Sequence, residues 1–392
     1  MPEPAPFVIS DDDRYSRLQL IAWWDQQKIA AAKVFVVGAG ALGNEVIKNL
    51  ALLGIGTIYV VDLDCIEHSN LSRSVMFRQD DAGKPKSDVV AQRAMEINPD
   101  VMVHPIRGNV ITDIGLGLFR EADVVIGCLD NREARLWVNR SCWKVGTPWV
   151  DGGIQEINGV AKVFVPPHGS CYECTMTEND YRLIQLRYSC PLLSQEDMLA
   201  GKVPTAPTIS SIIAGLQVQE ALKLIHDMPS AEGSALVFNG IANQFYQTRY
   251  PRREDCLSHE TYEKIESCQL SHQNSASELF AWADQQHGQR SWSIELDRDL
   301  LLELHCAQCE TVKQVGRPIQ SVNISEAECP ECGQTMRPET TCRIESNSEL
   351  AERKLSELTI PPWDIVRLSD EQTVVYAQLT GEDQFQHSDD AG

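Results

Sequence analysis

The sequence predicts an α/β protein: a doubly wound, Rossmann-like domain followed by a smaller α+β domain. Apolar strands alternate with helical segments in the first part of the chain, which is typical of a mostly parallel sheet covered on both faces. A polar stretch then precedes a region of different composition. We therefore assign residues 1–265 to the first domain, 266–277 to a linker and 278–392 to the C-terminal domain, and the length of 392 residues suffices for both.

The first strand and helix flank a glycine loop. Val34–Val37 is expected to be a buried parallel strand, Gly38-Ala-Gly40-Ala-Leu-Gly43 a tight turn, and Asn44–Leu53 a helix that ends at Gly54. Missing side chains let a backbone approach phosphates, and a helix N-terminus offers free amides and partial positive charge. The competing interpretation is a purely structural glycine turn.

A second strand favours nucleotide binding over that alternative. Ile58–Val61 is apolar and ends in Asp62, 24 positions after Gly38. A Rossmann half places its ribose-binding carboxylate at about this position. In isolation Asp62 would be an ordinary turn residue, but the preceding glycine loop predicts that it holds a ribose.

The remaining elements continue the alternation before the sheet changes character. Helices are expected at Asp88–Ile97, Asn131–Trp143 and Ser210–His226, with strands at Asp123–Cys128 and Gly159–Val165, the last in an antiparallel portion. Residues 175–207 lack clear periodicity and contain Pro191, Pro204 and Pro207, so we expect a crossover loop there.

Bulk properties limit the partners and the compartment. The net charge of −22 argues against nucleic acid and anionic membranes as electrostatic partners. No basic segment with an apolar core opens the sequence, and no apolar run approaches the length of a membrane span, so we expect a cytoplasmic protein. In a reducing compartment its 13 cysteines favour metal ligands, nucleophiles or core residues over disulfides.

Polar and cationic residues after Asp62 suggest a triphosphate. Asn70, Arg73 and Lys86 exceed what a dehydrogenase needs to distinguish ribose substituents, although each alone would be a solvated surface group. Asp130 follows the strand ending at Cys128, at the carboxyl edge where open parallel sheets bind ligands. A carboxylate there suits Mg²⁺, or it caps the helix beginning at Asn131.

Two cysteine pairs predict a zinc ribbon in the C-terminal domain. Cys306-x-x-Cys309 and Cys329-x-x-Cys332 are separated by 19 residues, a spacing typical of such ribbons. Four thiolates leave no open coordination position, so this site is expected to be structural. A third pair, Cys171-x-x-Cys174, lacks an obvious partner pair.

These motifs together resemble a known superfamily, that of the ubiquitin-activating enzymes and the molybdopterin- and thiamine-pathway adenylyltransferases. The resemblance covers Arg14 to His259. It is carried by Arg14-Tyr-Ser-Arg17, the glycine loop, Asp62 with Asp64, Ser69-Asn-Leu-Ser-Arg73, Gly83-Lys-Pro-Lys86 and Leu129-Asp-Asn131. It implies that ATP is used to adenylate the C-terminal glycine of a small ubiquitin-fold protein.

The resemblance also implies roles for individual residues. Asp62 would hold the ribose, the triad of Asn70, Arg73 and Lys86 the phosphates, and Asp130 the magnesium ion; Asp64 and Asn131 belong to the same nucleotide-binding motifs. Arg14 or Arg17 would reach across a dimer interface to the γ-phosphate, which implies a homodimer or pseudodimer, and we expect a homodimer. Cys256 and His259 stand where the family places its second cysteine pair, so they would complete a zinc site with Cys171 and Cys174, with Cys268 as the alternative fourth ligand. Two zinc ions per chain follow.

Cys190 is the candidate nucleophile. It lies on the expected crossover, near Arg182 and Arg187, which would favour its thiolate. Eukaryotic-type activating enzymes keep their thioester-forming cysteine at this position, but here Pro191 follows in place of the usual threonine. The other interpretation is an incidental loop cysteine.

Several functions remain open at this point. The leading hypothesis is adenylation followed by a thioester on Cys190 and transfer to a conjugating enzyme, which resembles bacterial ubiquitin-like conjugation operons, some tied to phage defence. The second is adenylation alone, as in sulfur-carrier activation. The third is a non-catalytic scaffold or a dinucleotide-binding dehydrogenase. Residues 355–377 are vaguely similar to the ubiquitin-fold domain that recruits conjugating enzymes, and no sulfurtransferase loop is evident there.

Overall fold

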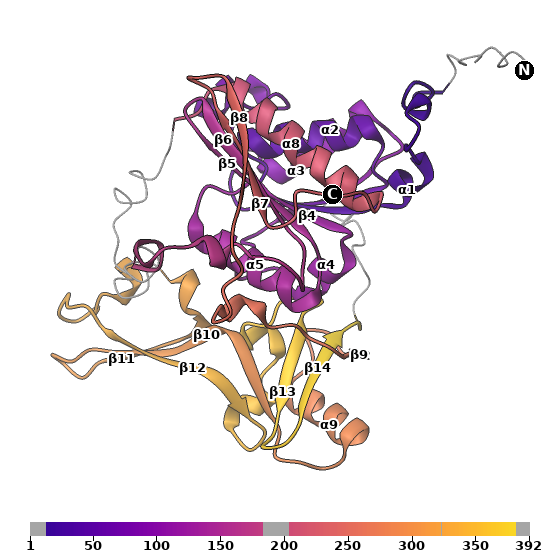
Figure 1. Cartoon of the computed structure of the whole chain (residues 1–392). Helices are drawn as coiled ribbons and strands as arrows, with labels where there is room; N and C mark the ends of the chain where they lie inside the picture. The colour runs from indigo at the N-terminus through magenta and orange to yellow at the C-terminus, as the bar shows by residue number, and fades with distance from the viewer. Residues whose placement is uncertain (1–12, 183–203, 323, 382–392) are drawn as a thin grey trace, which may run out of the picture.

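A computed structural model describes residues 13–182, 204–322 and 324–381 (Figure 1). Cys190, Pro191 and Arg187 lie outside these ranges, so the structure does not test the interpretation of Cys190. Among the described helices, none is both long and apolar enough to cross a bilayer.

The larger domain is built on an eight-stranded sheet of order β3-β2-β1-β4-β5-β6-β7-β8. The five parallel strands are β1 (Lys33–Val37), β2 (Thr57–Asp62), β3 (Met102–Arg107), β4 (Val124–Gly127) and β5 (Trp149–Gln155). The antiparallel strands β6 (Asn158–Phe164), β7 (Ser234–Asn239) and β8 (Gln244–Arg249) extend the sheet from β5. The strand order reverses beside β1, which places a switch point between β1 and β4.

Helices cover both faces of this sheet (Figure 1). On one face α1 (Gln26–Ala31), α2 (Ala41–Leu53), α3 (Lys86–Ile97) and α8 (Pro207–Ile225) enclose one apolar core. On the other face α4 (Leu116–Glu121) and α5 (Arg132–Val145) enclose a second core. The predicted doubly wound fold is therefore confirmed.

Three helices begin earlier than the sequence suggested, among them α3, which was expected from Asp88 and begins at Lys86. The helix expected from Asn44 begins at Ala41, because Gly40 serves as its N-cap and the glycine loop runs directly into the first turn. The helix expected from Ser210 begins at Pro207. Proline is tolerated at the first helical position, where its missing N–H would have no partner in any case. Residue 207 therefore starts α8 and does not belong to the crossover.

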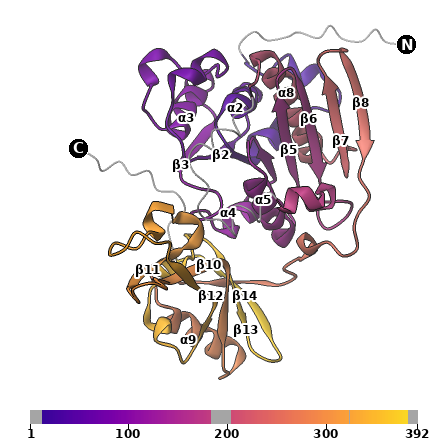
Figure 2. The same ribbon diagram turned by 90° about the vertical axis from the view of Figure 1, so that its left-hand side faces the viewer.

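The C-terminal domain contains a six-stranded, mainly antiparallel sheet of order β11-β10-β13-β14-β9, with β12 also paired to β10. Its strands are β9 (Ile265–Cys268), β10 (Ser293–His305), β11 (Val312–Pro318), β12 (Arg337–Glu345), β13 (Ile365–Ser369) and β14 (Val374–Leu379), and α9 (Ala276–His287) packs on its core. Figure 2 shows this sheet next to α4 and α5 of the larger domain. The expected α+β domain is confirmed.

The expectation of a linker over residues 266–277 is wrong. Residues 265–268 form β9, which pairs in parallel with β14, and Ser275 caps α9 in a capping box with Glu278. The polar residues that suggested a linker form the turn and helix cap between these two elements. Cys268 at the end of β9 is fully buried in the C-terminal core.

A buried ion pair joins the two domains. Arg298 on β10 is 2% exposed, and its guanidinium donates to the carbonyl oxygens of Ile111 and Ile114 in the larger domain. The same guanidinium lies 3.2 Å from the Asp364 carboxylate, whose other oxygen accepts the backbone N–H of Leu116 at the start of α4 at 2.8 Å. Because every partner is buried, this joint fixes the C-terminal domain against α4.

We expect Arg298→Ala to destabilise the chain by about 3–5 kcal/mol, because it leaves the Asp364 carboxylate buried without its counter-ion. The matched control is Arg343→Ala, which removes a solvent-exposed pair with Glu345 on β12 and should change the free energy of unfolding by less than about 0.5 kcal/mol. Urea unfolding at neutral pH measures both. Equal stabilities for the two variants would contradict the role given to the joint.

Candidate functional site

The glycine loop lies at the carboxyl end of β1, between β1 and α2, and close backbone packing explains two of its glycines. Gly38 has φ +99°, and a Cβ there would lie 2.5 Å from the carbonyl oxygen of Cys128 on the neighbouring β4 segment. A Cβ on Gly43 would lie 2.0 Å from the carbonyl oxygen of Gly38. Gly40 instead faces open space, with nothing within 4 Å of a built Cβ. The loop is thus tightly packed at Gly38 and Gly43 and open at Gly40, as a phosphate-binding loop requires.

Asp62 at the end of β2 lies directly beside this loop. Its carboxylate accepts the backbone N–H of Ala39 at 2.7 Å and that of Asp64 at 2.8 Å. Burial raises the pKa of Asp62, and the nearby Lys86 ammonium counteracts this effect. The carboxylate is therefore held in a fixed orientation at the carboxyl edge of the sheet, where a ribose would be bound.

Lys86 joins the same cluster from the first residue of α3. Its side chain is only 12% exposed, and its Nζ lies 2.7 Å from the Asp64 carboxylate. The backbone N–H of Lys86 also donates to the carbonyl oxygen of Asp64 at 3.0 Å. Asp62, Asp64 and Lys86 are thus brought together, as the sequence predicted.

Asn70 and Arg73 lie on the excursion between β2 and α3, residues 63–85. The Asn70 side chain accepts the backbone N–H of Glu67 at 3.0 Å, and the Arg73 guanidinium donates to the carbonyl oxygen of Ser69 at 2.9 Å. Both side chains therefore brace the short 3₁₀ helix His68–Ser72 in this structure. No hydrogen bond joins either side chain to the glycine loop among the described residues.

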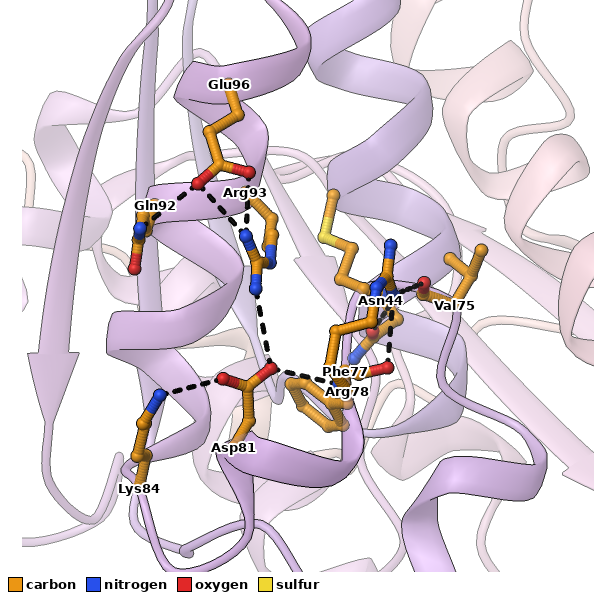
Figure 3. A network of polar contacts seen from close by, with 10 residues as sticks. Asn44, Val75, Phe77, Arg78, Asp81, Lys84, Gln92, Arg93 and Glu96 are labelled. Carbon is orange, nitrogen blue, oxygen red and sulfur yellow. Dashed lines mark hydrogen bonds and ion pairs between the residues drawn. The ribbon is translucent and has the colours of Figure 1, made fainter.

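A polar network anchors the far part of the excursion to α3 (Figure 3). The buried Asp81 carboxylate accepts the backbone N–H of Arg78 at 2.9 Å and the Lys84 ammonium at 2.9 Å. Arg93 on α3 approaches the same carboxylate at 3.7 Å and is held in turn by Glu96 at 2.8 Å. The hydrogen bond to Lys84 lowers the pKa of Asp81, so it stays ionised near neutral pH.

Asp130 is exposed beyond the end of β4, at the carboxyl edge of the sheet. The alternative role considered for it, the N-cap of α5, is wrong. Asn131 is the N-cap, and its side-chain oxygen accepts the backbone N–H of Ala134 at 2.8 Å. Among the described residues, the hydrogen bond of the Asp130 carboxylate is a long one, 3.3 Å from the Asn131 amide, and the exposed carboxylate is accessible to a cation.

Sequence reasoning missed a buried cluster beside Asp130. Arg135 on α5 forms an ion pair with the buried Asp151 at 2.9 Å and donates to the carbonyl oxygens of Leu129 and Gly152. Lys162 lies opposite Asp151 in the antiparallel register of β5 and β6, and its ammonium lies over the rings of Tyr172 and Tyr250. Burial lowers the pKa of Lys162. The sequence signal was an Asp at the end of an apolar strand opposite a Lys, which no local pattern connects to Arg135.

The Arg14 side chain is directed away from the glycine loop of its own chain. The Arg14 guanidinium donates to the carbonyl oxygen of Ile97 at the C-terminal end of α3, 2.7 Å away, and Arg17 is exposed. Lys86 starts that same helix, and 11 residues of helical rise separate the two ends by about 16 Å. If Arg14 contacts a nucleotide, that nucleotide would therefore have to be bound to another chain.

The first metal-ligand cluster draws on two distant segments. Cys171 Sγ lies 3.7 Å from Cys174 Sγ and 3.5 Å from Cys256 Sγ, and Cys174 Sγ lies 3.4 Å from His259 Nε2. Ligand atoms on a tetrahedral zinc ion with Zn–S bonds near 2.3 Å are separated by about 3.8 Å. The donors and their spacing therefore fit zinc. Burial lowers the pKa of His259, which favours the neutral imidazole that a metal requires.

The structure also settles which residue is the fourth donor of that cluster. His259 stacks on Trp143 with ring centroids 4.8 Å apart, which orients its Nε2 toward Cys174. Cys268, the alternative, lies in the C-terminal core. It is therefore excluded as a ligand.

The second cluster contains all four cysteines of the predicted ribbon. Cys306 Sγ lies 3.5 Å from Cys332 Sγ, and Cys309 Sγ lies 3.4 Å from Cys329 Sγ and 3.7 Å from Cys332 Sγ. Four thiolates at these separations match a structural zinc site with no open position.

We expect the purified full-length chain to carry two zinc ions, one for each of these clusters. Cys174→Ser and Cys329→Ser should each remove about one ion per chain, because each variant loses one of four donors. Cys268→Ser is the matched control, a buried cysteine outside both clusters, and should keep both ions. Inductively coupled plasma mass spectrometry gives the stoichiometry, and metal loss in the Cys268 variant would contradict the assignment.

Comparison with known proteins shows which family and which characterised proteins this chain is similar to. The model of the ThiF family matches residues 13–258. The SAMP-activating enzyme E1 of Haloferax volcanii is 32% identical over 277 residues, covering 66% of this chain and 96% of that protein. The sulfur carrier protein ThiS adenylyltransferase of Escherichia coli is 30% identical over 247 residues, covering 62% of this chain and 93% of that protein.

A similar fold occurs in solved structures. The crystal structure of E. coli MccB with ATP superposes with a TM-score of 0.52 at 27% identity, covering 64% of this chain and 74% of that chain. Because the family model matches well over half of the sequence, this protein belongs to the ThiF family.

Proposed function

We propose that this protein uses ATP to adenylate the C-terminal glycine carboxylate of a ubiquitin-like protein and then forms a thioester on Cys190. The observation that carries the first step is the cluster at the carboxyl edge of β2, β1 and β4. There the glycine loop, Asp62, Lys86 and the accessible Asp130 share one end of three adjacent parallel strands. The similarity to relatives named as an E1 and as an adenylyltransferase supports the same chemistry.

The first step is a substitution at the α-phosphorus of ATP. A carboxylate oxygen of the modifier attacks that phosphorus, the bond to the oxygen bridging to the β-phosphate breaks, and pyrophosphate leaves with both electrons. Lys86, together with Arg73 once its side chain turns to the nucleotide, offsets the negative charge of the departing pyrophosphate. Asp130 would hold the magnesium ion that neutralises the phosphates.

In the second step the Cys190 thiolate attacks the carbonyl carbon of the adenylate. A C–S bond forms, the bond from that carbon to the phosphate oxygen breaks, and AMP leaves. The protein would act as a homodimer, because Arg14 is bonded at the far end of α3 from Lys86 and would, with Arg17, serve the partner's nucleotide site. The C-terminal domain would then recruit a conjugating enzyme.

Adenylation without a thioester is the second candidate. It is favoured by the similarity to the ThiS adenylyltransferase, which spans 93% of that protein. A non-catalytic scaffold and a dehydrogenase remain the alternatives that an assay of adenylation would exclude.

For the first step we expect modifier-dependent exchange of pyrophosphate into ATP. Asp130→Ala and Lys86→Ala should each lower the exchange rate by about 100-fold or more, since each removes charge stabilisation that develops at the phosphates. The controls are Lys28→Ala and Asp227→Ala, which break an exposed ion pair between α1 and the end of α8 and should retain full activity. Undiminished exchange in the Asp130 and Lys86 variants would refute this nucleotide site.

For the second step we expect a thiol-sensitive adduct between the chain and its modifier on a non-reducing gel. Cys190→Ala should abolish the adduct while pyrophosphate exchange continues, because adenylation does not use the thiol. Cys342→Ala, which removes an exposed cysteine on β12, should leave the adduct intact. Exchange without any adduct in the unaltered protein would favour the adenylation-only function.

A further inference from the structure

Asn44, on the first turn of α2, is a buried amide whose partners lie outside its own helix. Its side chain is 0% exposed. Its Nδ2 donates to the carbonyl oxygen of Ala39 at 2.7 Å and to that of Gly40 at 3.0 Å. Both carbonyls belong to the glycine loop, so the side-chain amide of Asn44 fixes the loop from its buried side.

The other end of the same side chain holds the excursion that follows β2. Asn44 Oδ1 accepts the backbone N–H of Met76 at 2.9 Å, and Ser74, Met76 and Phe77 around this bond are buried. Figure 3 shows Asn44 beside Val75 and Phe77, on the opposite side of the network from Asp81 and Arg93. One side chain therefore connects the glycine loop to the backbone three residues after Arg73.

The two carbonyl bonds also set the direction of the loop amides. In a trans peptide the C=O and the following N–H point in opposite directions within one plane. When the carbonyls of Ala39 and Gly40 point inward to Asn44, the N–H groups of Gly40 and Ala41 point outward. Gly40 also has open space around it: its chain neighbours aside, no atom of the described residues lies within 4 Å of a Cβ placed there.

We propose that Asn44 is a positioning residue for the nucleotide. It aims the loop amides of Gly40 and Ala41 at the phosphates and fixes the distance between that loop and the excursion carrying Asn70 and Arg73. Without the Asn44 hydrogen bonds, the peptide planes of the glycine-rich loop could rotate. The loop would then lose conformational entropy when it binds ATP. Asn44 itself is too deeply buried to contact the nucleotide. The inference rests on the proposed nucleotide site but assigns a residue beyond it.

The decisive variant is Asn44→Asp, which has the same shape. It keeps the acceptor for the Met76 N–H but turns a carboxylate oxygen toward the two loop carbonyls and adds negative charge beneath the phosphates. Asn44→Ala removes both the donor to the loop carbonyls and the acceptor for the Met76 N–H. The matched control is Val46→Ala, which shortens another fully buried side chain of α2 that lies in the apolar core and has no polar contact with the loop.

The measurement is isothermal titration of the full-length protein with AMPCPP and Mg²⁺, without any modifier, alongside the melting temperature of each variant. We expect Asn44→Asp to weaken AMPCPP binding by about tenfold or more and Asn44→Ala by several-fold, as expected for lost hydrogen bonds to a charged ligand's binding loop. Val46→Ala should bind within about twofold of the unaltered protein despite a lower melting temperature. In pyrophosphate exchange the Asn44 variants should raise the KM for ATP more than they lower kcat.

A folded Asn44→Asp variant that binds AMPCPP as the unaltered protein does would overturn the inference. If both variants fail to fold, Asn44→Ser, whose hydroxyl can donate to only one carbonyl, replaces them, and unchanged binding in that variant would overturn it equally. The proposed function fails separately: an unaltered protein that binds AMPCPP but exchanges no pyrophosphate with any glycine-ended modifier would refute adenylation while leaving the role of Asn44 intact.

Discussion

The close packing of backbone at the end of β1 is the constraint on which the rest of the site depends. Gly38 lies against the carbonyl of Cys128, and Gly43 lies against the carbonyl of Gly38, so strand, loop and helix touch without side chains between them. This contact brings the start of α2 to the switch point between β1 and β4, next to Asp62 on one side and Asp130 on the other. A larger residue at either glycine would push α2 away from the sheet and open the cradle.

The strongly negative overall charge is compatible with the proposed triphosphate site, because the charges next to the glycine loop differ from the net charge of the chain. The chain carries −22, yet Lys86 lies beside Asp62 and Asp64 next to the glycine loop, and both carboxylates are already engaged. Asp62 accepts two backbone N–H groups, and Asp64 is paired with Lys86. Opposite charges within a few ångströms outweigh distant surface carboxylates, which salt screens.

The smaller domain is stabilised by further features in addition to its apolar core. The four-cysteine cluster connects the end of β10 to the segment before β12, and Arg298 ties β10 to the larger domain through buried carbonyls and Asp364. Glycine also matters at this joint, because a Cβ on Gly115 or Gly117 would lie within 2.3 Å of a carbonyl oxygen in the loop at Pro362 and Trp363. These close contacts at α4 therefore fix both the position and the orientation of the C-terminal domain.

The sequence by itself determined the features that depend on local chemistry. Strand and helix periodicity, the glycine loop with Asp62 and the cysteine pairs were all visible there, because each is a short pattern with its own physical reason. Tertiary structure alone decided between His259 and Cys268 as a ligand, turned the expected linker into β9, and paired Arg135 with Asp151. In each case the deciding partner is distant in sequence. Trp143 orients His259, β14 pairs with β9, and Asp151 on β5 forms the ion pair with Arg135. Burial makes such partners obligatory, but no local pattern reveals which distant residue supplies them.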